Sequence, residues 1–517
     1  MSPGKGFAVA GGGVPPNMEP GGEGGMAFPW LPSPAPSPPM TPEQTHAGSP
    51  EDSNPMLVMK FGGSSLATLE HLQRVSDIVT KHVDRRPVLV LSAMGKQTNE
   101  LLAAAKNALS TGTVDLSKVR QITESVFEEL KISIPAEISS LLEELGRILS
   151  GIALLKEIST RTRDLVVSFG ERMSVRTFMA VFNHAAEASG SKLLAKAIDS
   201  WEAGMLTSSG GGSANSAFTQ CEVLPQTYTS LASYFFPLRM DYKYIPVVTG
   251  YVAKDAQGTI TTLGRDGSDL SATVIGAALL ASEVQIWKDV SGVMTTDPRV
   301  VPAARPVGVL TFEEAAELST FGAKVVHPAA ILPAWLAKVP ISVRNSIKPQ
   351  DPGTRIVAEM AEVDSRESRV AAMSSKRDIT MIVIRSTRML GQHGFLAHVF
   401  QVFNKFEVSV DVIATSEVTV SLTLDRGFKA VDLDGLRKEL ECVAKVEIRE
   451  SMAMLTLIAS RSDSCTVLRQ AFQAFEELGV EVEMVSHGAS NVNVTFVVPD
   501  ASLLKCTGKL HERFFER

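Results

Sequence analysis

Short apolar runs that end in Gly-rich polar turns recur along the first two thirds of the chain, and an amphipathic segment follows each. MLVMKF (56–61) leads into GGSSLAT and then into apolar residues at helical spacing from Leu69 to Val83. The unit recurs at residues 88–109. A third copy begins at residues 245–250, where a short polar strand precedes the helix. This alternation predicts an α/β fold with a mainly parallel sheet that helices cover on both faces.

Two further segments complete this first domain. Residues 110–188 have apolar positions at helical spacing and predict a helical elaboration on the sheet. SSGGGSANS (208–216) is a flexible loop by composition, and QDPG (350–353) is a Pro/Gly break that we expect to close the catalytic domain. We therefore place this domain at residues 56–355.

Beyond residue 365 the chain contains an internal repeat with an offset of 72 residues. Phe400 and Val408, for example, match Phe472 and Val480. Each copy reads strand, helix, strand, strand, and apolar positions alternate along its strands. We predict two small α+β units that pack side by side, at residues 370–445 and 446–517.

Composition excludes several classes of protein. Of the 517 residues 44% are hydrophobic and 21% are charged, and no apolar run approaches the roughly 18 residues of a membrane helix. The net charge of -7, with Lys and Arg dispersed, argues against a nucleic-acid partner. Cys221, Cys442, Cys465 and Cys506 lie far apart, which disfavours a zinc site or a disulfide framework and favours a reducing compartment.

Residues 1–55 are rich in Gly, Pro and Ser and carry too little apolar surface to fold, so we expect a disordered extension. This stretch has no Arg, one Lys (Lys5) and several acidic residues, whereas a targeting peptide is typically Arg-rich and poor in acids. A cleaved transit peptide and a retained tail therefore both stay open.

A first candidate for phosphate binding is the turn after the first predicted strand. The chain lacks the motif G-x-x-x-x-G-K-[ST] and the H-R-D and D-F-G motifs of protein kinases. Instead, Lys60 lies near the end of the strand, and Gly62, Gly63 and two serines follow before a helix. Glycines let backbone amides approach an anion, and Lys60 would add a full positive charge. A solvated lysine beside a tight turn is the alternative.

Two more loops with polar groups have the same place in their units. SAMGKQTN presents Ser92 and Thr98, and TLGRDGS presents Arg265 shortly before Asp269 and a helix that begins near Leu270. Strand-end loops of a parallel sheet meet at one edge, where open α/β folds bind ligands. We therefore expect the three loops to form one site.

The motifs KFGGSSLAT, SAMGKQTN, SFGERMSVR, TLGRDGSDLSA, WKDVSGVMTTDPRVV and FGAKVVHPAA follow in this order from about residue 56 to 347, and they resemble those of aspartate kinases in the amino-acid kinase family. The repeat resembles the paired ACT domains of the same enzymes, and STRMLGQHGFLAHVF is similar to the monofunctional, lysine-sensitive plant and algal type. The resemblance implies an amino-acid kinase sandwich followed by two ferredoxin-like ACT domains. No homoserine dehydrogenase domain is expected, because the chain ends at Arg517.

The resemblance also implies a reaction. ATP with Mg²⁺ would phosphorylate the β-carboxylate of L-aspartate to 4-phospho-L-aspartate, the first step of lysine, threonine and methionine biosynthesis. A carboxylate is already a nucleophile at neutral pH and needs no general base, so catalysis reduces to alignment and charge stabilisation. Lys60, Arg265 and Asp289 would be the catalytic residues, with Asp289 orienting Lys60.

Motif by motif, the resemblance assigns ligands to residues. Glu171 would bind the substrate ammonium and Arg265 its α-carboxylate, and we expect no metal site built by the protein itself. The aspartate site would comprise Ser92, Thr98, Glu171, Arg265, Ser268 and Asp269. The ATP site would comprise Lys60, Gly62, Gly63, Lys288, Asp289, Arg299, Lys324 and Val325.

For the first ACT repeat, the resemblance implies a lysine site between the two chains of a homodimer, with threonine as the alternative effector. Asp411 and Glu417 suit an ε-ammonium. The implied location is the plastid stroma, with the cytoplasm as the alternative. The effector site would comprise Met389, Gln392, His393, Gly394, Phe395, Val410, Asp411, Thr415, Ser416 and Glu417.

Several of these residues also have a more ordinary interpretation. A Glu in an amphipathic helix, such as Glu171, is usually exposed, His327 fits a helix start, and Asp297 before a proline fits a turn. Two other functions stay open: a kinase for acetylglutamate or glutamate, and a catalytically impaired amino-acid sensor. Glu171 argues against acetylglutamate, because an acylated amine carries no charge.

One position departs from the family pattern Arg-Gly-Gly-Ser-Asp, because Asp266 stands where the first glycine is expected. Asp tolerates a left-handed backbone, so we expect the turn to survive at a cost of about 1 kcal/mol. A carboxylate about 6 Å from a bound carboxylate costs on the order of 3 kcal/mol at an effective dielectric of about 20, so we expect weakened aspartate binding.

Overall fold

The computed structural model describes most of the chain from Pro55 onward. Arg265, Lys324, Val325, Met389 and Gln392 lie outside the described residues, as do residues 1–54 and most of the predicted loop at 208–216. The described stretches are 55–210, 221–264, 266–322, 326–358, 369–386, 393–424, 432–459, 464–488 and 492–516.

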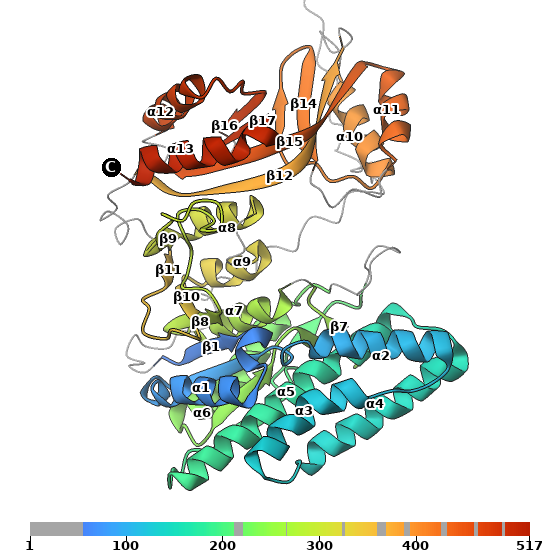
Figure 1. The fold of residues 1–517 in the computed structure, drawn as a ribbon. Coiled ribbons are helices and arrows are strands. Elements are labelled where there is room, and N and C mark those ends of the chain that lie inside the picture. Colours follow the sequence, from blue (N-terminus) through green and yellow to red (C-terminus); the bar gives the residue numbers. More distant parts are fainter. Residues whose placement is uncertain are drawn as a thin grey trace, which may run out of the picture. The chain divides into compact units, whose positions relative to one another are not determined.

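The catalytic domain is built on an eight-stranded sheet, most of whose neighbouring strands run parallel (Figure 1). Only the pairing of β10 with β11 is antiparallel among the described strands of this sheet. Across the sheet the order is β3 (Ala195–Ile198), β5 (Ile245–Thr249), β2 (Pro87–Leu91), β1 (Leu57–Phe61), β8 (Glu283–Lys288), β10 (Ile341–Asn345), β11 (Thr354–Val357) and β9 (Val309–Thr311).

Helices cover both faces of this sheet, as the sequence predicts. Successive residues of β1 point to opposite faces, so Val58 packs with α6, α7 and α9 while Met59 packs with α1 and α5. The predicted helical elaboration forms a separate core between α2, α3, α4 and α5. The helices are α1 (Leu69–Thr80), α2 (Gln97–Thr111), α3 (Ser117–Leu130), α4 (Ala136–Leu155), α5 (Thr160–Ala188), α6 (Gln226–Met240), α7 (Gly267–Leu279), α8 (Phe312–Thr320) and α9 (Pro328–Leu336).

The register of the central strands places the predicted loops together. Lys60 in β1 lies between Val90 of β2 and Ile286 of β8, and β2 is in turn the parallel neighbour of β5. The turns after β1, β2, β5 and β8 therefore leave the sheet at the same edge. The third predicted loop reaches this edge from a small sheet of β4 (Leu206–Thr207), β6 (Val252–Asp255) and β7 (Ile260–Thr262), which precedes α7.

The main sheet continues past the Pro/Gly break that we expected to close the domain. Residues 350–353 form a turn, and β11 then returns antiparallel to β10, with Ile356 opposite Ile341. The predicted domain end at residue 355 therefore falls inside a strand. Since Ile356 is buried in the same core as Val58, the break marks a reversal of the chain and not a boundary.

The C-terminal region forms one six-stranded sheet with helices against it. Two of its strands, β12 and β15, are long and run antiparallel through both ACT units (Figure 1). In order across the sheet the strands are β13 (Ile413–Thr415), β14 (Thr419–Leu424), β12 (Val370–Arg385), β15 (Lys445–Ala459), β17 (Asn493–Pro499) and β16 (Met484–His487). The helices are α10 (Phe395–Lys405), α11 (Leu433–Glu441), α12 (Ser464–Glu477) and α13 (Leu503–Phe515).

The two ACT units are therefore nested and not consecutive. The first half of β12, from Val370, pairs with the second half of β15, and the second half of β12 pairs with the first half of β15. The predicted boundary between residues 445 and 446 lies within β15. Asp378 and Ser451, near the middle of the two strands, adopt a left-handed backbone with φ of 56° each, and the pairing register shifts on both sides of Ile379. These irregularities separate two halves whose strands are continuous.

Among the described residues, no helix has the length and apolar character needed to cross a membrane.

Candidate active site

Lys60, Lys288 and Asp269 form a compact ion cluster at the edge where the strands end. The Lys60 ammonium lies 2.6 Å from Oδ1 of Asp269, and the Lys288 ammonium lies 3.3 Å from Oδ2. Lys60 comes from β1, Lys288 ends the adjacent strand β8, and Asp269 lies in the first turn of α7. The distant strand β1 thus meets the consecutive elements α7 and β8 at one carboxylate.

Asp269 is 1% exposed, and its charge depends on the two lysines. Burial alone would raise the pKa of Asp269, but the ammonium groups of Lys60 and Lys288 outweigh burial and hold the pKa below its usual value. One carboxylate is shared by two ammonium groups, so the cluster keeps one net positive charge. A site of this kind attracts a phosphate.

The Gly-rich turn after β1 packs closely against the next strand-end loop. A Cβ atom at Gly63 would lie 2.6 Å from the carbonyl oxygen of Ala93, and the Gly95 amide donates to the carbonyl of Gly63 over 2.9 Å. Gly62 is more open, since a Cβ atom there would lie 3.7 Å from Nζ of Lys60. The turn continues as a 3-10 helix, Gly63–Leu66, so glycine 63 is required by packing and glycine 62 leaves space beside the ammonium group.

The predicted aspartate side of the site is also assembled. The Ser92 hydroxyl donates to the Ser268 hydroxyl over 2.9 Å, which links the loop after β2 to the first turn of α7. Thr98 lies in the first turn of α2, and Gly170 brings α5 against it, since a Cβ atom at Gly170 would lie 3.7 Å from Oγ1 of Thr98. Ser92, Thr98 and Ser268 therefore line neighbouring walls.

Glu171 is a buried carboxyl group, so its ordinary interpretation as an exposed surface residue is wrong. Its side chain is 4% exposed, and Oε1 accepts the Ala93 amide hydrogen over 3.3 Å. Oε2 has no hydrogen-bond partner among the described residues. Burial raises the pKa of Glu171 to about 8 although the backbone donors act in the opposite direction. An unpartnered buried oxygen of this kind fits a cationic ligand.

Tyr251 is part of this site although the sequence reasoning did not single it out. Burial raises the pKa of Tyr251, and the nearby carboxylates of Glu171 and Asp164 raise it further. A Cβ atom at Gly267 would lie 2.9 Å from Cδ2 of Tyr251, so glycine 267 lets α7 approach the ring. Tyr251 follows β5 by two residues, and the strand-end rule could have found it.

A second missed feature fixes α5, the helix that carries Glu171. Arg176 lies one turn further along this helix and binds Asp199 with two nitrogens, Nη1 at 3.0 Å and Nη2 at 3.3 Å. Asp199 directly follows β3. This buried bidentate pair ties α5 to the sheet and thereby holds Glu171 in place.

Asp289 does not orient Lys60 in this structure. The ion pair of Lys60 is with Asp269, and Asp289 is exposed in the turn after β8. The reason is geometric: β8 ends at Lys288, whose ammonium group points to Asp269, and the next residue leaves the strand. The predicted role of Asp289 in orienting Lys60 is therefore wrong.

The segment after β8 forms a hairpin whose tip is exposed. Arg299 is 87% exposed and pairs with Asp297 over 2.7 Å, and Asp297 also accepts the Arg299 amide hydrogen. Asp297 thus forms the turn that the sequence predicts. His327 caps α9 through Nδ1, which accepts the Ala329 amide hydrogen over 3.3 Å, so its interpretation as a helix start is confirmed.

Asp266 adopts a left-handed backbone conformation. Its φ is 55° and ψ is 25°, it is exposed, and its carbonyl accepts the Asp269 amide hydrogen over 2.9 Å. The turn survives the substitution, as expected. α7 begins at Gly267, three residues before the predicted start near Leu270.

The described effector residues fall into two groups on either side of β13. Asp411 precedes this strand and pairs with Lys376 of β12 over 3.0 Å. Phe395 and Val410 pack against one core. Gly394 precedes α10 and has a φ of 89°, and His393 before it is exposed. On the other side, Thr415, Ser416 and Glu417 lie at the turn from β13 to β14.

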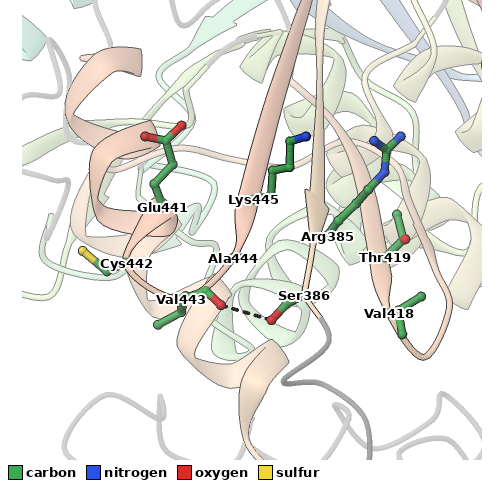
Figure 2. A pocket seen from close by; sticks show the side chains of 9 residues that line it. All are labelled: Arg385, Ser386, Val418, Thr419, Glu441, Cys442, Val443, Ala444 and Lys445. Carbon is green, nitrogen blue, oxygen red and sulfur yellow. Dashed lines mark hydrogen bonds between the residues drawn. The ribbon is translucent and has the colours of Figure 1, made fainter.

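A cavity of about 520 Å³ lies in the ACT sheet. Figure 2 shows Arg385 and Lys445 on neighbouring strands with both side chains directed the same way, and the Ser386 hydroxyl donating to the carbonyl of Val443 over 3.0 Å. The cavity adjoins the predicted effector residue Glu417 through Val418. Its charged side chains are exposed, so it is a surface depression at the end of the first ACT unit.

Fold and site together define a kinase domain for small charged metabolites joined to an ACT module. Residues 55–345 match the amino acid kinase family, and residues 462–514 match an ACT domain. Aspartokinase 1, chloroplastic, of Arabidopsis thaliana is 43% identical over 473 residues, which cover 89% of this chain and 80% of the relative. Lysine-sensitive aspartokinase 3 of Escherichia coli is 34% identical, over 89% of this chain and 99% of the relative. The chain belongs to the aspartokinases of the amino acid kinase family.

Solved structures agree with this assignment. Aspartokinase III of E. coli in complex with aspartate and ADP, in the R-state, is similar with a TM-score of 0.70 at 33% identity, covering 89% of this chain and 100% of that one. The same enzyme in complex with lysine and aspartate, in the T-state, has a TM-score of 0.69 at 32% identity, covering 89% of this chain and 99% of that one. The amino-acid kinase sandwich, the ACT region and the ATP-dependent aspartate kinase activity expected from the sequence are confirmed.

The pKa of Glu171 leads to a prediction for stability. The unfolded carboxyl group ionises near 4.5, whereas the folded one keeps its proton up to about 8, so the folded state binds more protons between these values. Its contribution to stability is fully present below the lower value and is lost as pH rises through the upper one. Glu171→Gln is neutral in both states and lacks this loss. As pH increases, the free energy of unfolding of Glu171→Gln should therefore rise relative to that of the wild type, by up to about 1.4 kcal/mol per pH unit. Denaturant titrations of the ligand-free proteins from about pH 5 to 8 measure this, and a constant difference would contradict the argument.

Proposed function

We propose that the enzyme transfers the γ-phosphoryl group of ATP to the β-carboxylate of L-aspartate and forms 4-phospho-L-aspartate. The observation that carries the proposal is the unpartnered, buried Oε2 of Glu171 in the same site as the Lys60, Asp269 and Lys288 cluster. A ligand with an ammonium group at one end and an attacking carboxylate at the other fits these two features.

The residues divide between the two substrates. Glu171 holds the ammonium group of aspartate, Ser92, Thr98 and Ser268 line its pocket, and Arg265 takes its α-carboxylate. Lys60 and Lys288 stabilise the charge that develops on the transferred phosphoryl group, and Asp269 aligns both ammonium groups. Asp289, Arg299, Lys324 and Val325 complete the ATP side, with the backbone of Gly62 and Gly63.

Mg²⁺ fits this site as a partner of the nucleotide. No cluster of three His, Cys, Asp or Glu side chains that could hold a metal occurs among the described residues. Mg²⁺ usually keeps several waters and binds through substrate phosphates and one or two carboxylates, and the exposed Asp289 could supply one. When bound, the ion would neutralise phosphate charge. The protein's own contribution is the cluster of two lysines.

The alternative of a catalytically impaired homologue is not favoured, since the relatives named above are aspartokinases and the ion cluster is intact. Acetylglutamate is disfavoured because its neutral amide nitrogen would leave Glu171 Oε2 without a counter-charge.

A trapping experiment tests the substrate. The purified enzyme is incubated with ATP, Mg²⁺ and either aspartate, glutamate or acetylglutamate, and hydroxylamine converts any acyl phosphate to a hydroxamate. We expect a product with aspartate alone. Glu171→Gln should raise KM for aspartate at least about tenfold, because a charge-assisted hydrogen bond is worth about 1.5–3 kcal/mol, with little change in KM for ATP. A hydroxamate from acetylglutamate, or an unchanged KM for aspartate in the variant, would remove the role given to Glu171.

Asp266 supplies a second prediction for aspartate binding. Its carboxylate adjoins Arg265 in sequence and repels a bound α-carboxylate, although its exposure weakens the effect by solvent screening. Asp266→Gly should lower KM for aspartate about fivefold, which corresponds to about 1 kcal/mol, with little change in kcat. Asp266→Asn keeps the left-handed turn without the charge and serves as the control. Steady-state kinetics of the three proteins decide: equal values of KM would show that the carboxylate points into solvent.

For regulation, we infer that lysine binds at the first ACT unit of a homodimer and lowers activity, with threonine as the alternative effector. The effector residues on the two sides of β13 suit a site to which two chains contribute. Asp411 already binds one ammonium group, that of Lys376, so its surroundings accept this chemistry. A bound lysine would compete with Lys376 for the carboxylate and thereby favour one of two states.

Asp411→Ala should therefore abolish inhibition by lysine while the enzyme still turns over in its absence. Dose–response curves with lysine and threonine measure this for the variant and for Asp434→Ala, a control that removes an acid from α11 instead. Inhibition that persists in Asp411→Ala would place the effector elsewhere. A wild type that ignores millimolar lysine would make threonine the next effector to test.

For location, we propose the plastid stroma and a place in lysine, threonine and methionine biosynthesis. Support comes from the Arabidopsis relatives, which are named chloroplastic.

A further inference from the structure

The segment that joins β8 to β9 begins as a hairpin with a buried root and an exposed tip. At the root, the Thr295 amide donates to the carbonyl of Arg305 over 2.9 Å, and the Arg305 amide donates back to Oγ1 of Thr295 over 3.1 Å. The Val307 amide donates to the carbonyl of Val293 over 2.8 Å. Thr295 is 4% exposed, whereas Arg299 lies at the solvent-facing tip. The position of the tip therefore depends on the root.

The ACT module contacts this root at Thr295 from two of its elements. The Met373 amide, in β12, donates to the carbonyl of Thr295 over 2.7 Å. The imidazole of His511, in α13, lies with Nε2 3.0 Å from Oγ1 of the same threonine. His511 is 0% exposed, and its ring packs against Phe515 with the centroids 4.9 Å apart. A residue next to the last turn of the chain's C-terminal helix thus reaches into the kinase domain.

The hydrogen-bond partners fix the direction of this contact. The Glu516 carboxylate, 2.8 Å from Nδ1 of His511, can only accept, so Nδ1 of the neutral imidazole carries the hydrogen. Nε2 then accepts the hydroxyl hydrogen of Thr295, whose Oγ1 also accepts the Arg305 amide hydrogen. In this tautomer every donor along the chain has an acceptor, from Arg305 through Thr295 and His511 to Glu516. The imidazole has a defined place and a defined partner at each nitrogen.

Two further hydrogen bonds between described residues of the ACT module and the kinase domain fall on α8 and the residue after it. The Ser374 hydroxyl donates to the carbonyl of Phe321 over 2.6 Å, and the Asn493 amide donates to the Glu317 carboxylate over 2.5 Å. Thr295 differs from these residues because it belongs to the segment given to ATP.

We propose that His511 is a positioning residue that holds the root of this hairpin, so that the ACT module sets the geometry of the ATP site through Thr295. The proposal rests on the function proposed above, in which Arg299 at the tip contacts ATP. It predicts that disturbing His511 weakens ATP binding and leaves aspartate binding largely as it is, because Glu171, Ser92 and Ser268 lie on other segments.

A pair of substitutions at His511 tests the contact. The Asn side chain can replace Nδ1 but is too short to reach Thr295, whereas the Gln side chain can place a polar atom near the position of Nε2. His511→Asn should raise KM for ATP about five- to tenfold, which is the loss expected for one hydrogen bond, with KM for aspartate within about twofold. His511→Gln should recover most of the wild-type KM for ATP. Equal effects of Asn and Gln on both substrates would overturn the proposal.

Thr295→Val tests the same contact from the kinase side and avoids a change in the ACT core. It should raise KM for ATP as His511→Asn does, and the double variant should be no worse than either single one, because both remove one interaction. Additive effects of the two substitutions would overturn the proposal. A lowered melting temperature in both variants with every kinetic constant unchanged would also overturn it and make the contact merely structural.

Arg299→Ala separates this proposal from the function on which it rests. If Arg299→Ala leaves KM for ATP unchanged, the hairpin does not bind ATP and both assignments fall. If Arg299→Ala raises KM for ATP while His511→Asn and Thr295→Val do not, the ATP site stands and the positioning role of His511 is wrong. An increase in KM for ATP in all three variants would support both the ATP site and the positioning role of His511.

Discussion

The arrangement of the kinase site depends on one carboxylate that two ammonium groups share. Lys60 and Lys288 lie near the ends of adjacent parallel strands, and without Asp269 between them two like charges would face each other across neighbouring strands. Their partner comes from the first turn of α7, the helix that also supplies Ser268 and begins beside Asp266. Because breaking a buried ion pair by removing one partner is costly, this cluster fixes the strand edge, the helix start and the phosphate-binding charge together.

The region around Glu171 depends on a different constraint, a carboxyl group whose pKa burial raises to about 8. Glu171 has one oxygen held by the Ala93 amide and one left without a described partner, and the Arg176–Asp199 pair fixes its helix to the sheet. The two halves of the site therefore have opposite electrostatics. One half carries two ammonium groups that share one carboxylate, and the other holds a buried carboxyl group with a raised pKa.

The sequence predicts much of this because its signals are local. Apolar runs and Gly-rich turns indicate the strands, and ordered motifs place Lys60, Ser92, Ser268 and Lys288 at the ends of segments that meet. What it could not predict depends on contacts between distant segments. The partner of Lys60 is Asp269 and not Asp289, since the direction of a side chain at a strand end follows from the packing of α7 on the sheet. The burial of Glu171 is a further example, because its hydrogen-bond partner Ala93 lies 78 residues earlier in the chain. A repeat of 72 residues likewise suggests consecutive domains, although the pairing of β12 with β15 nests them.

That nesting has a consequence for the order in which the chain can fold as it is made. The first half of β12 pairs with the second half of β15, so Val370 cannot pair until Ala459 has been synthesised. The next strand of the sheet, β17, is synthesised later still. Until then the first half of β12 is an apolar strand without this neighbour, which is the kind of edge that chains can pair with wrongly. Synthesis through β17 thus precedes completion of the regulatory sheet, and a ribosome that stops before it releases a kinase domain attached to a half-built sheet.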